Sequence, residues 1–254
     1  MKGTLINVLS LFLILSVVIL VYSISFMQDS NNRKQKEVQF SEDLYVINNA
    51  LKLGKLYLET SLDYSVYQAM YDVAKNGGWD TKKDNLNIDD NLLKEAVKKK
   101  IAANLKKYTE KNYNFLGKII RLPPYEESGI IIEKESDGSP KIIAKGRENF
   151  YFEEKKTASM EKRLVRFEQS SNLEKTYAFR FFSLHEKAKE IMSGLKDCKK
   201  EEKTDGDYGI TTDPDTTGKQ CTVTVKEKDR TFPVYTGTKV SFEPISFNFL
   251  VKIS

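Results

Sequence analysis

The first 28 residues differ from the rest of the chain in having a long run of apolar positions. Residues 3–28 carry no charged side chain, and residues 11–21 read Leu-Phe-Leu-Ile-Leu-Ser-Val-Val-Ile-Leu-Val. About 20 apolar residues cross the roughly 30 Å of bilayer hydrocarbon as a helix. Tyr22 and Phe26 stand where interfacial aromatic residues are common. The pattern predicts a transmembrane anchor over residues 1–28, with residues 3–28 in contact with the lipid bilayer.

The same segment has features of a cleaved secretory signal. Ser23 and Ser25 lie three and one positions before a possible cut ahead of Phe26, and small residues are typical there. The apolar core from residue 5 to 21 is long for a signal peptide, which favours an anchor that is retained. Cleavage stays the alternative.

Two patterns disagree about which side of the membrane holds the rest of the chain. Lys2 precedes the apolar run and several basic residues follow it between positions 33 and 36, which by the positive-inside rule favours a cytoplasmic body. The only two cysteines, Cys198 and Cys221, can pair as a disulfide, which is typical of oxidising compartments. We expect a single-pass protein of the cell membrane with the bulk of the chain extracytoplasmic.

A helical pattern follows the anchor and is predicted to continue it. Apolar positions recur every three or four residues from about residue 35 to 75, and Asn76-Gly77-Gly78 then provides a helix end. These positions are Phe40, Leu44, Ile47, Leu51, Leu58, Leu62, Val66, Ala69 and Val73.

A second helix is expected to open at Asp89 or Asp90 and to pack on the first. Its apolar face is Leu93, Val97, Ile101, Leu105 and Tyr108. Residues 29–122 are therefore predicted to form a helical stalk or hairpin.

The pattern becomes β-rich after Pro123-Pro124, and residues 123–254 are predicted to form an α+β head. The expected strands cover residues 129–135, 141–144, 150–152, 164–167, 222–226, 232–235, 240–242 and 245–253. Asp137-Gly138 marks a turn between the first two. The last strand alternates large apolar residues, which predicts a central position in its sheet.

A third helix is predicted to interrupt these strands. Ser171-Asn-Leu-Glu174 has the form of a capping box, and an apolar stripe runs behind it from Leu173 to Leu195. The predicted fold class is α+β: an N-terminal transmembrane helix continuing into a long amphipathic helix, then a mostly antiparallel sheet packed with helices.

The composition excludes several classes of activity but points to no particular one. Among 254 residues, 41 Lys and Arg against 36 Asp and Glu leave a net charge of only +5, which does not favour nucleic-acid binding. The single His and two Cys are too few for a zinc site and remove the usual base from most nucleophile-plus-His mechanisms. No phosphate-binding loop or nucleophile elbow occurs. We expect no enzymatic activity, catalytic residue, cofactor or metal site.

The cysteine pair is the clearest candidate chemistry in the chain. A bond from Cys198 to Cys221 would tie down an intervening loop rich in Asp, Gly, Thr and Lys. Closing a loop of about 24 residues contributes roughly 3 kcal/mol in the chain-entropy model.

Other polar features have plainer explanations. The loop carboxylates Asp205, Asp207, Asp213 and Asp215 match no calcium-loop spacing and suit turns. His185 lies just off the apolar stripe of the third predicted helix, which favours a buried structural role.

Lys2-Gly3 directly before a hydrophobic helix, its amphipathic continuation and a β-rich head together resemble type IV pilins and archaeal pilin-like proteins. The overall layout also resembles uncharacterised archaeal single-pass membrane proteins. The pilin resemblance implies that a peptidase cuts after Gly3, which makes Thr4 the mature start, and that the hydrophobic helices bundle as a filament core. Val8 then stands at the fifth mature position, where that family often carries Glu.

These inferences lead to an expected function. The chain is predicted to be a membrane-anchored extracytoplasmic structural or interaction protein of the cell surface, with a protein partner or self-association. The alternative is an extracytoplasmic ligand-binding or sensor module, which a defined pocket with convergent polar groups would favour.

Overall fold

The computed structural model describes residues 2–115, 118–158, 161–216, 219–228, 230–237 and 239–253. Side chains are described except in residues 2–19, 36, 38–40, 43, 115, 118, 153–158 and 161–165. The fold is α+β with mostly antiparallel sheets, as predicted. The chain divides into two compact units, Met1–Ala50 and Leu51–Ser254, which we call the N-terminal and C-terminal units.

Helix α1 covers Lys2–Lys75 without a break, so the join between the predicted anchor and the amphipathic segment is helical. It ends where the sequence predicted. Gly77 and Gly78 both have positive φ. The Gly78 N–H donates to the Val73 carbonyl at 2.8 Å, so this carbonyl in the last turn of the helix has a hydrogen-bond partner.

Along the described helices we find no stretch with the length and apolarity required to cross a membrane. The side chains of residues 2–19, which make up most of the predicted anchor, lie outside the described residues. The division into 1–28, 29–122 and 123–254 stays a prediction.

Helix α2, Asp90–Thr109, opens as expected. The Asp89 side chain accepts hydrogen bonds from the backbone N–H groups of Asn91 and Leu92, which caps the helix. The apolar positions that were predicted to face the core are buried, except that Tyr108 stays 36% exposed. Two contacts join α2 to α1: Tyr57 Oη donates to the Tyr108 carbonyl at 3.1 Å, and Asn104 Nδ2 donates to the Ser65 carbonyl at 3.5 Å. The predicted packing of the two helices is confirmed.

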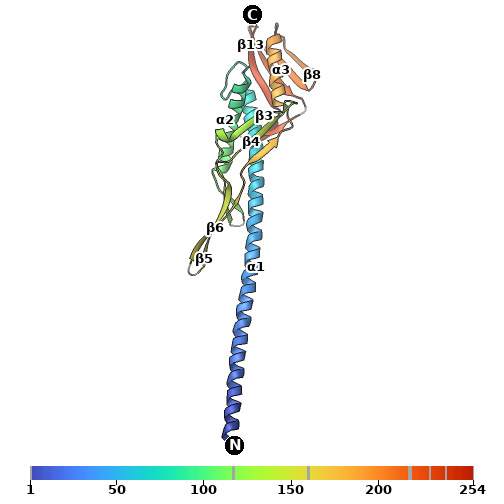
Figure 1. Ribbon diagram of the computed structural model, residues 1–254. Helices are drawn as coiled ribbons and strands as arrows, with labels where there is room; N and C mark the ends of the chain where they lie inside the picture. The colour runs from blue at the N-terminus through green and yellow to red at the C-terminus, as the bar shows by residue number, and fades with distance from the viewer. Residues whose placement is uncertain are drawn as a thin grey trace. The chain divides into compact units, whose positions relative to one another are not determined.

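The described strands form four antiparallel sheets in the C-terminal unit (Figure 1). The first has the order β1 (Tyr113–Phe115), β2 (Lys118–Arg121), β5 (Phe150–Ala158), β6 (Glu161–Gln169). The second has the order β3 (Ile130–Lys134), β4 (Pro140–Ala144), β7 (Leu173–Thr176). The third has the order β13 (Ser246–Lys252), β10 (Gln220–Glu227), β9 (Tyr208–Pro214), β8 (Glu201–Asp205). The fourth pairs β11 (Phe232–Tyr235) with β12 (Val240–Glu243), and a short 3-10 helix, η1 (Glu127–Gly129), precedes β3.

The β-rich part starts earlier and has longer strands than the sequence predicted. Strands β1 and β2 precede Pro123, where the change had been expected. The lysine-rich segment 155–162, predicted as a connection, belongs largely to the long β5–β6 hairpin. The turn at Gly138, with φ of 81°, joins β3 to β4 as predicted.

The prediction of the third helix is wrong at its start. Leu173–Thr176 is strand β7, paired with β4, and helix α3 begins only at Phe181 and runs to Gly194. The residues of the apparent capping box have other partners, because Ser171 Oγ donates to the Glu148 carbonyl and Glu174 pairs with Lys141 at 2.8 Å. The strand pairing satisfies backbone groups over this stretch, so tertiary contacts override the local helical signal.

Two predictions about the third sheet also need correction. The segment between Cys198 and Cys221, expected to be a loop, contains the β8–β9 hairpin. Strand β13 lies at the edge of its sheet, where it pairs only with β10 among the described strands. Its outer side is instead bonded by the loop after α1, since Leu250 N–H donates to the Asp84 carbonyl at 2.5 Å. Helix α3 packs on β10 and β13 (Figure 1).

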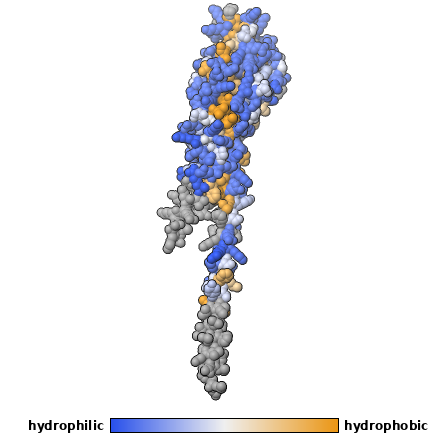
Figure 2. Space-filling view, viewed as in Figure 1, coloured by the Kyte–Doolittle hydropathy of each residue, from blue (hydrophilic) through white to orange (hydrophobic). Residues whose placement is uncertain are grey.

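The core of the C-terminal unit is built from α1, α2, α3 and the inner faces of the sheets. Its largest fully buried side chains include Phe150, Tyr177, Phe179, Phe181 and Phe247. Figure 2 shows hydrophobic residues in a band on the visible face of this unit, bordered by hydrophilic residues.

Candidate functional site

A groove in the C-terminal unit lies where α1, α2 and the β11–β12 hairpin meet. Its volume is about 470 Å³, within the usual range of ligand pockets. The groove is lined by Tyr64, Gln68, Asp72, Asn104, Lys107, Tyr108, Pro233, Val234, Tyr235, Gly237 and Val240. We call it the tyrosine groove.

Each of the three elements contributes one tyrosine to the groove. Tyr64, Tyr108 and Tyr235 are 44%, 36% and 57% exposed, so part of each ring is accessible to solvent. The pKa of Tyr108 is raised by burial and by the nearby Tyr57 and Tyr64 phenols, which keeps its hydroxyl protonated. The groove therefore presents aromatic rings that combine an apolar body with a polar hydroxyl.

The polar side chains of the groove are held by bonds to each other. Gln68 Nε2 donates to Asp72 Oδ1 at 2.9 Å, and Lys107 Nζ donates to Asn104 Oδ1 at 3.0 Å. Among the described residues, Asp72 and Lys107 make no ion pair. One carboxylate and one ammonium thus remain able to bond a ligand, and their charges cancel.

Gln68 also fixes the hairpin that forms one wall. The Tyr235 N–H donates to Gln68 Oε1 at 2.6 Å, and Gln68 Nε2 donates to the Tyr235 carbonyl at 3.2 Å. This amide therefore pairs with the strand edge as a neighbouring strand would. An aromatic cluster holds the base of the same hairpin, where Phe232 lies 5.1 Å from the Tyr67 ring and 5.0 Å from the Phe179 ring, between centroids.

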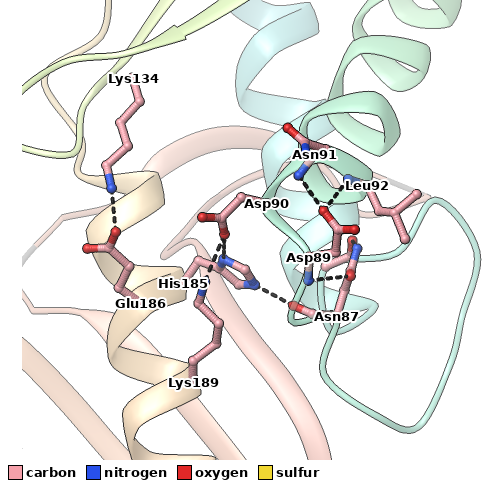
Figure 3. Close-up of polar contacts among 10 residues, drawn as sticks. Asn87, Asp89, Asp90, Asn91, Leu92, Lys134, His185, Glu186 and Lys189 are labelled. Carbon is pink, nitrogen blue, oxygen red and sulfur yellow. Dashed lines mark hydrogen bonds and ion pairs between the residues drawn. The ribbon is translucent and has the colours of Figure 1, made fainter.

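The single histidine belongs to a different, buried cluster (Figure 3). His185 in α3 is fully buried, and its Nε2–H donates to the Asn87 carbonyl at 2.5 Å. Its Nδ1 lies 3.3 Å from Asp90 Oδ1 without a hydrogen bond, and Asp90 Oδ1 accepts a bond from Lys189 Nζ at 2.8 Å. The ring packs against Phe247 with centroids 5.1 Å apart. This histidine links α3, α2 and β13.

Burial determines the charge state of this histidine. Desolvation is the largest effect and lowers the pKa of His185, and the positive charge of Lys189 lowers it further. The Asn87 carbonyl and the Asp90 carboxylate raise this pKa, but by less. Burial alone would raise the pKa of Asp90, but its bond to Lys189 brings the value below the usual range. The lowered pKa favours the neutral form of His185, and its burial agrees with the structural role predicted from the sequence.

The predicted disulfide is present. Cys198 and Cys221 are bonded, with Cα atoms 5.6 Å apart and a sequence separation of 23 residues. The bond joins the segment after α3 to the start of β10, and Cys221 is fully buried.

The carboxylates weighed as a calcium site do not converge. Asp205 pairs with Lys187 at 2.6 Å, Asp207 pairs with Arg180, and Asp215 accepts a bond from the Gln220 N–H. Within the described ranges, no group of three or more His, Cys, Asp and Glu side chains lies close enough to hold a metal ion. The predicted processing site, Gly3 and Thr4, lies outside the residues whose side chains are described.

Sequence reasoning missed the tyrosine groove, although one signal for it was present. Tyr64, Gln68 and Asp72 are spaced four residues apart and so share one face of α1. The residues that complete the groove come from positions 104–108 and 233–240, which no local pattern connects to this stripe.

Comparison with known proteins adds no relative. No family model, curated protein or solved structure matches this chain.

Proposed function

We propose that the protein is a membrane-anchored, extracytoplasmic interaction protein of the cell surface. Residues 1–28 anchor it in the bilayer, and the C-terminal unit makes the functional contacts through the tyrosine groove. The uncharged run over residues 3–28 supports the anchor.

The observation that carries this proposal is the composition of the tyrosine groove. Half-exposed tyrosines are common at binding surfaces, because their rings give contact area at low entropic cost and their hydroxyls bond polar groups. The groove combines three of them with an amide network and a cavity of about 470 Å³. These features suit reversible binding and require no chemical step.

The disulfide supports the extracytoplasmic location. Disulfides persist in oxidising compartments and are rare where thiols are kept reduced. A structural bond that anchors β10 therefore favours a C-terminal unit outside the cytoplasm.

A second candidate within this proposal is a filament subunit. It rests on the resemblance of Lys2-Gly3 and the following apolar helix to type IV pilins. In that case the mature chain starts at Thr4 and the apolar helices associate.

The intact mass of the native protein from its own membranes, with and without reductant, tests these alternatives together. A chain that begins at Met1 supports the simple anchor, a start at Thr4 supports the filament subunit, and a start near Phe26 refutes the anchor. A mass gain of about two hydrogens on reduction reports one disulfide.

Membrane fractionation with matched variants tests the anchor directly. Val17→Lys with Val18→Lys places two charges in the apolar run, each costing about 3 kcal/mol at the bilayer centre, and is expected to move the protein to the soluble fraction. Asn31→Lys with Asn32→Lys adds the same charge beyond the run and should leave the protein in the membrane fraction. Equal fractionation of both variants would contradict the anchor.

A further inference from the structure

We infer that the tyrosine groove binds a neutral carbohydrate, a short oligosaccharide that lies along α1 between Tyr64 and Asp72. This inference rests on the proposed function, since it names the class of ligand that the C-terminal unit contacts.

The groove has the length of an extended ligand. Tyr64 and Asp72 are eight residues apart on α1, which is about 12 Å along the helix axis. Tyr108 from α2 lies near the Tyr64 end, since its carbonyl accepts a bond from Tyr57 Oη, and Tyr57 lies about two helical turns before Tyr64 on α1. Tyr235 stands beside Gln68 in the middle, to which it is bonded. Aromatic rings therefore occur along the groove and are not confined to one point.

The charge of the groove favours an uncharged ligand. Among the described residues that line the groove, Asp72 and Lys107 are the only ionisable groups other than the tyrosines, and their formal charges sum to zero. A ligand with net charge would gain little attraction from this pair, and burying its charge would cost free energy. A ligand with hydroxyl groups can instead donate to the carboxylate and accept from the ammonium.

The strand edge beside Gln68 has no free backbone group at Tyr235. A peptide that adds a strand to a sheet needs free N–H and C=O groups at the sheet edge. At the groove wall, the N–H and C=O of Tyr235 are both bonded by Gln68. Strand addition is therefore blocked at this position, which favours a ligand that bonds side chains over an extended peptide.

A sugar ring matches the remaining groups. Its C–H faces are apolar and can lie against the accessible Tyr64 and Tyr108 rings, while the hydroxyls on its rim can reach Asp72, Asn104 and Lys107. The bonds between Gln68 and Asp72 and between Lys107 and Asn104 hold these polar groups in place before binding, which reduces the entropy lost on association.

The test is a binding titration of the full chain in phospholipid nanodiscs, because a sugar-headed detergent would compete for the groove. The probes are four neutral trisaccharides, namely maltotriose, cellotriose, chitotriose and mannotriose, with trialanine as the peptide probe. Saturation-transfer difference NMR and calorimetry report binding. At least one trisaccharide is expected to bind with a dissociation constant of about 1 mM or below, and trialanine is not.

Variants assign the binding to the groove. Tyr64→Ala is expected to weaken trisaccharide binding about tenfold through loss of a stacking surface, and Asp72→Ala to weaken it by a similar factor. Tyr45→Ala is the matched control, since Tyr45 lies on α1 outside the groove and is 70% exposed. It should leave binding unchanged. Circular dichroism verifies that each variant is folded.

Three results would overturn the inference: no trisaccharide binds at about 10 mM, trialanine binds and the sugars do not, or Tyr64→Ala and Asp72→Ala both keep full affinity. Its failure is separable from failure of the proposed function. If the fractionation variants support the anchor and no sugar binds, only the carbohydrate assignment is lost.

Discussion

Replacing His185 by leucine is expected to destabilise the C-terminal unit, because His185 is the polar link between α3 and the loop that precedes α2. In the native protein its Nε2–H satisfies the Asn87 carbonyl, and Asn87 is only 1% exposed. Leucine has a similar volume and keeps much of the contact with Phe247, so the main change is the loss of one donor in a buried site.

The magnitude follows from the carbonyl that is left without a partner. An unsatisfied buried acceptor costs about 1–3 kcal/mol. Imperfect repacking against Phe247 adds up to about 1 kcal/mol, as for other volume-conserving core changes. We expect a total loss of about 2–3 kcal/mol, which lowers the melting temperature of a unit of this size by roughly 5–10 °C. His185→Gln can place an amide N–H near the position of Nε2 and should lose less.

The pH dependence provides an independent readout of the same residue. Burial lowers the pKa of His185 in the folded state, so the unfolded chain binds the proton more readily. The stability of the native protein therefore falls as pH drops below the unfolded value of about 6.5, and continues to fall until the folded pKa is reached. The slope from this one group is at most about 1.4 kcal/mol per pH unit. The advantage of the native protein over the leucine variant should be largest above pH 7.

The assay is urea unfolding of the full chain, followed by circular dichroism at several pH values between about 5 and 8. Other titrating groups affect native and variant proteins alike, so the difference between them isolates His185. The account is refuted if the leucine variant unfolds within about 0.5 kcal/mol of the native protein. It is also refuted if the difference grows as the pH falls, since that would mean the folded state binds the proton.

Two further predictions concern backbone and covalent constraints. Gly138→Ala is expected to cost about 3 kcal/mol in urea unfolding, since its φ is 81° and an added Cβ would lie 1.8 Å from Ser183 Oγ. Gly194→Ala, where a Cβ meets nothing within 4 Å, is the matched control, and an equal loss in both would contradict the steric argument. Reduction of the Cys198–Cys221 bond is expected to lower the free energy of unfolding by about 3 kcal/mol. The same melting temperature with and without reductant would contradict this prediction, because it would mean that the Cys198–Cys221 bond does not stabilise the fold.

Local signals in the sequence were sufficient for several elements. The end of α1 at Gly77-Gly78 and the Asp89 cap of α2 follow from backbone preferences of a few adjacent residues. The β3–β4 hairpin follows from a turn at Gly138 between two apolar runs. The disulfide followed from the cysteine count, because two cysteines allow only one intramolecular pair.

Local signals failed where a distant segment supplies the partner. At the N-terminus of α3, the Phe182 N–H donates to the Gly138 carbonyl at 3.1 Å and the Arg180 N–H donates to Glu227 Oε2 at 3.4 Å. Distant segments therefore supply acceptors at a helix start where the side chain of the N-cap residue makes no capping bond. The residues that resembled a capping box at Ser171 instead lead into strand β7, which pairs with β4. The β8–β9 hairpin was missed because β8 is exposed along its whole length and shows no alternation of burial.

The sequence by itself thus determined the period of the strongly apolar helical segments, the end of α1, the start of α2 and the only possible disulfide, because these depend on neighbouring residues or on a count. Only the tertiary structure decided that β13 lies at a sheet edge, where the Asp84 carbonyl covers it, and that the stripe from Tyr64 to Asp72 becomes one wall of a groove. Both depend on which distant segments pair, and pairing is set by the packing of the whole unit, which periodicity along the chain does not encode.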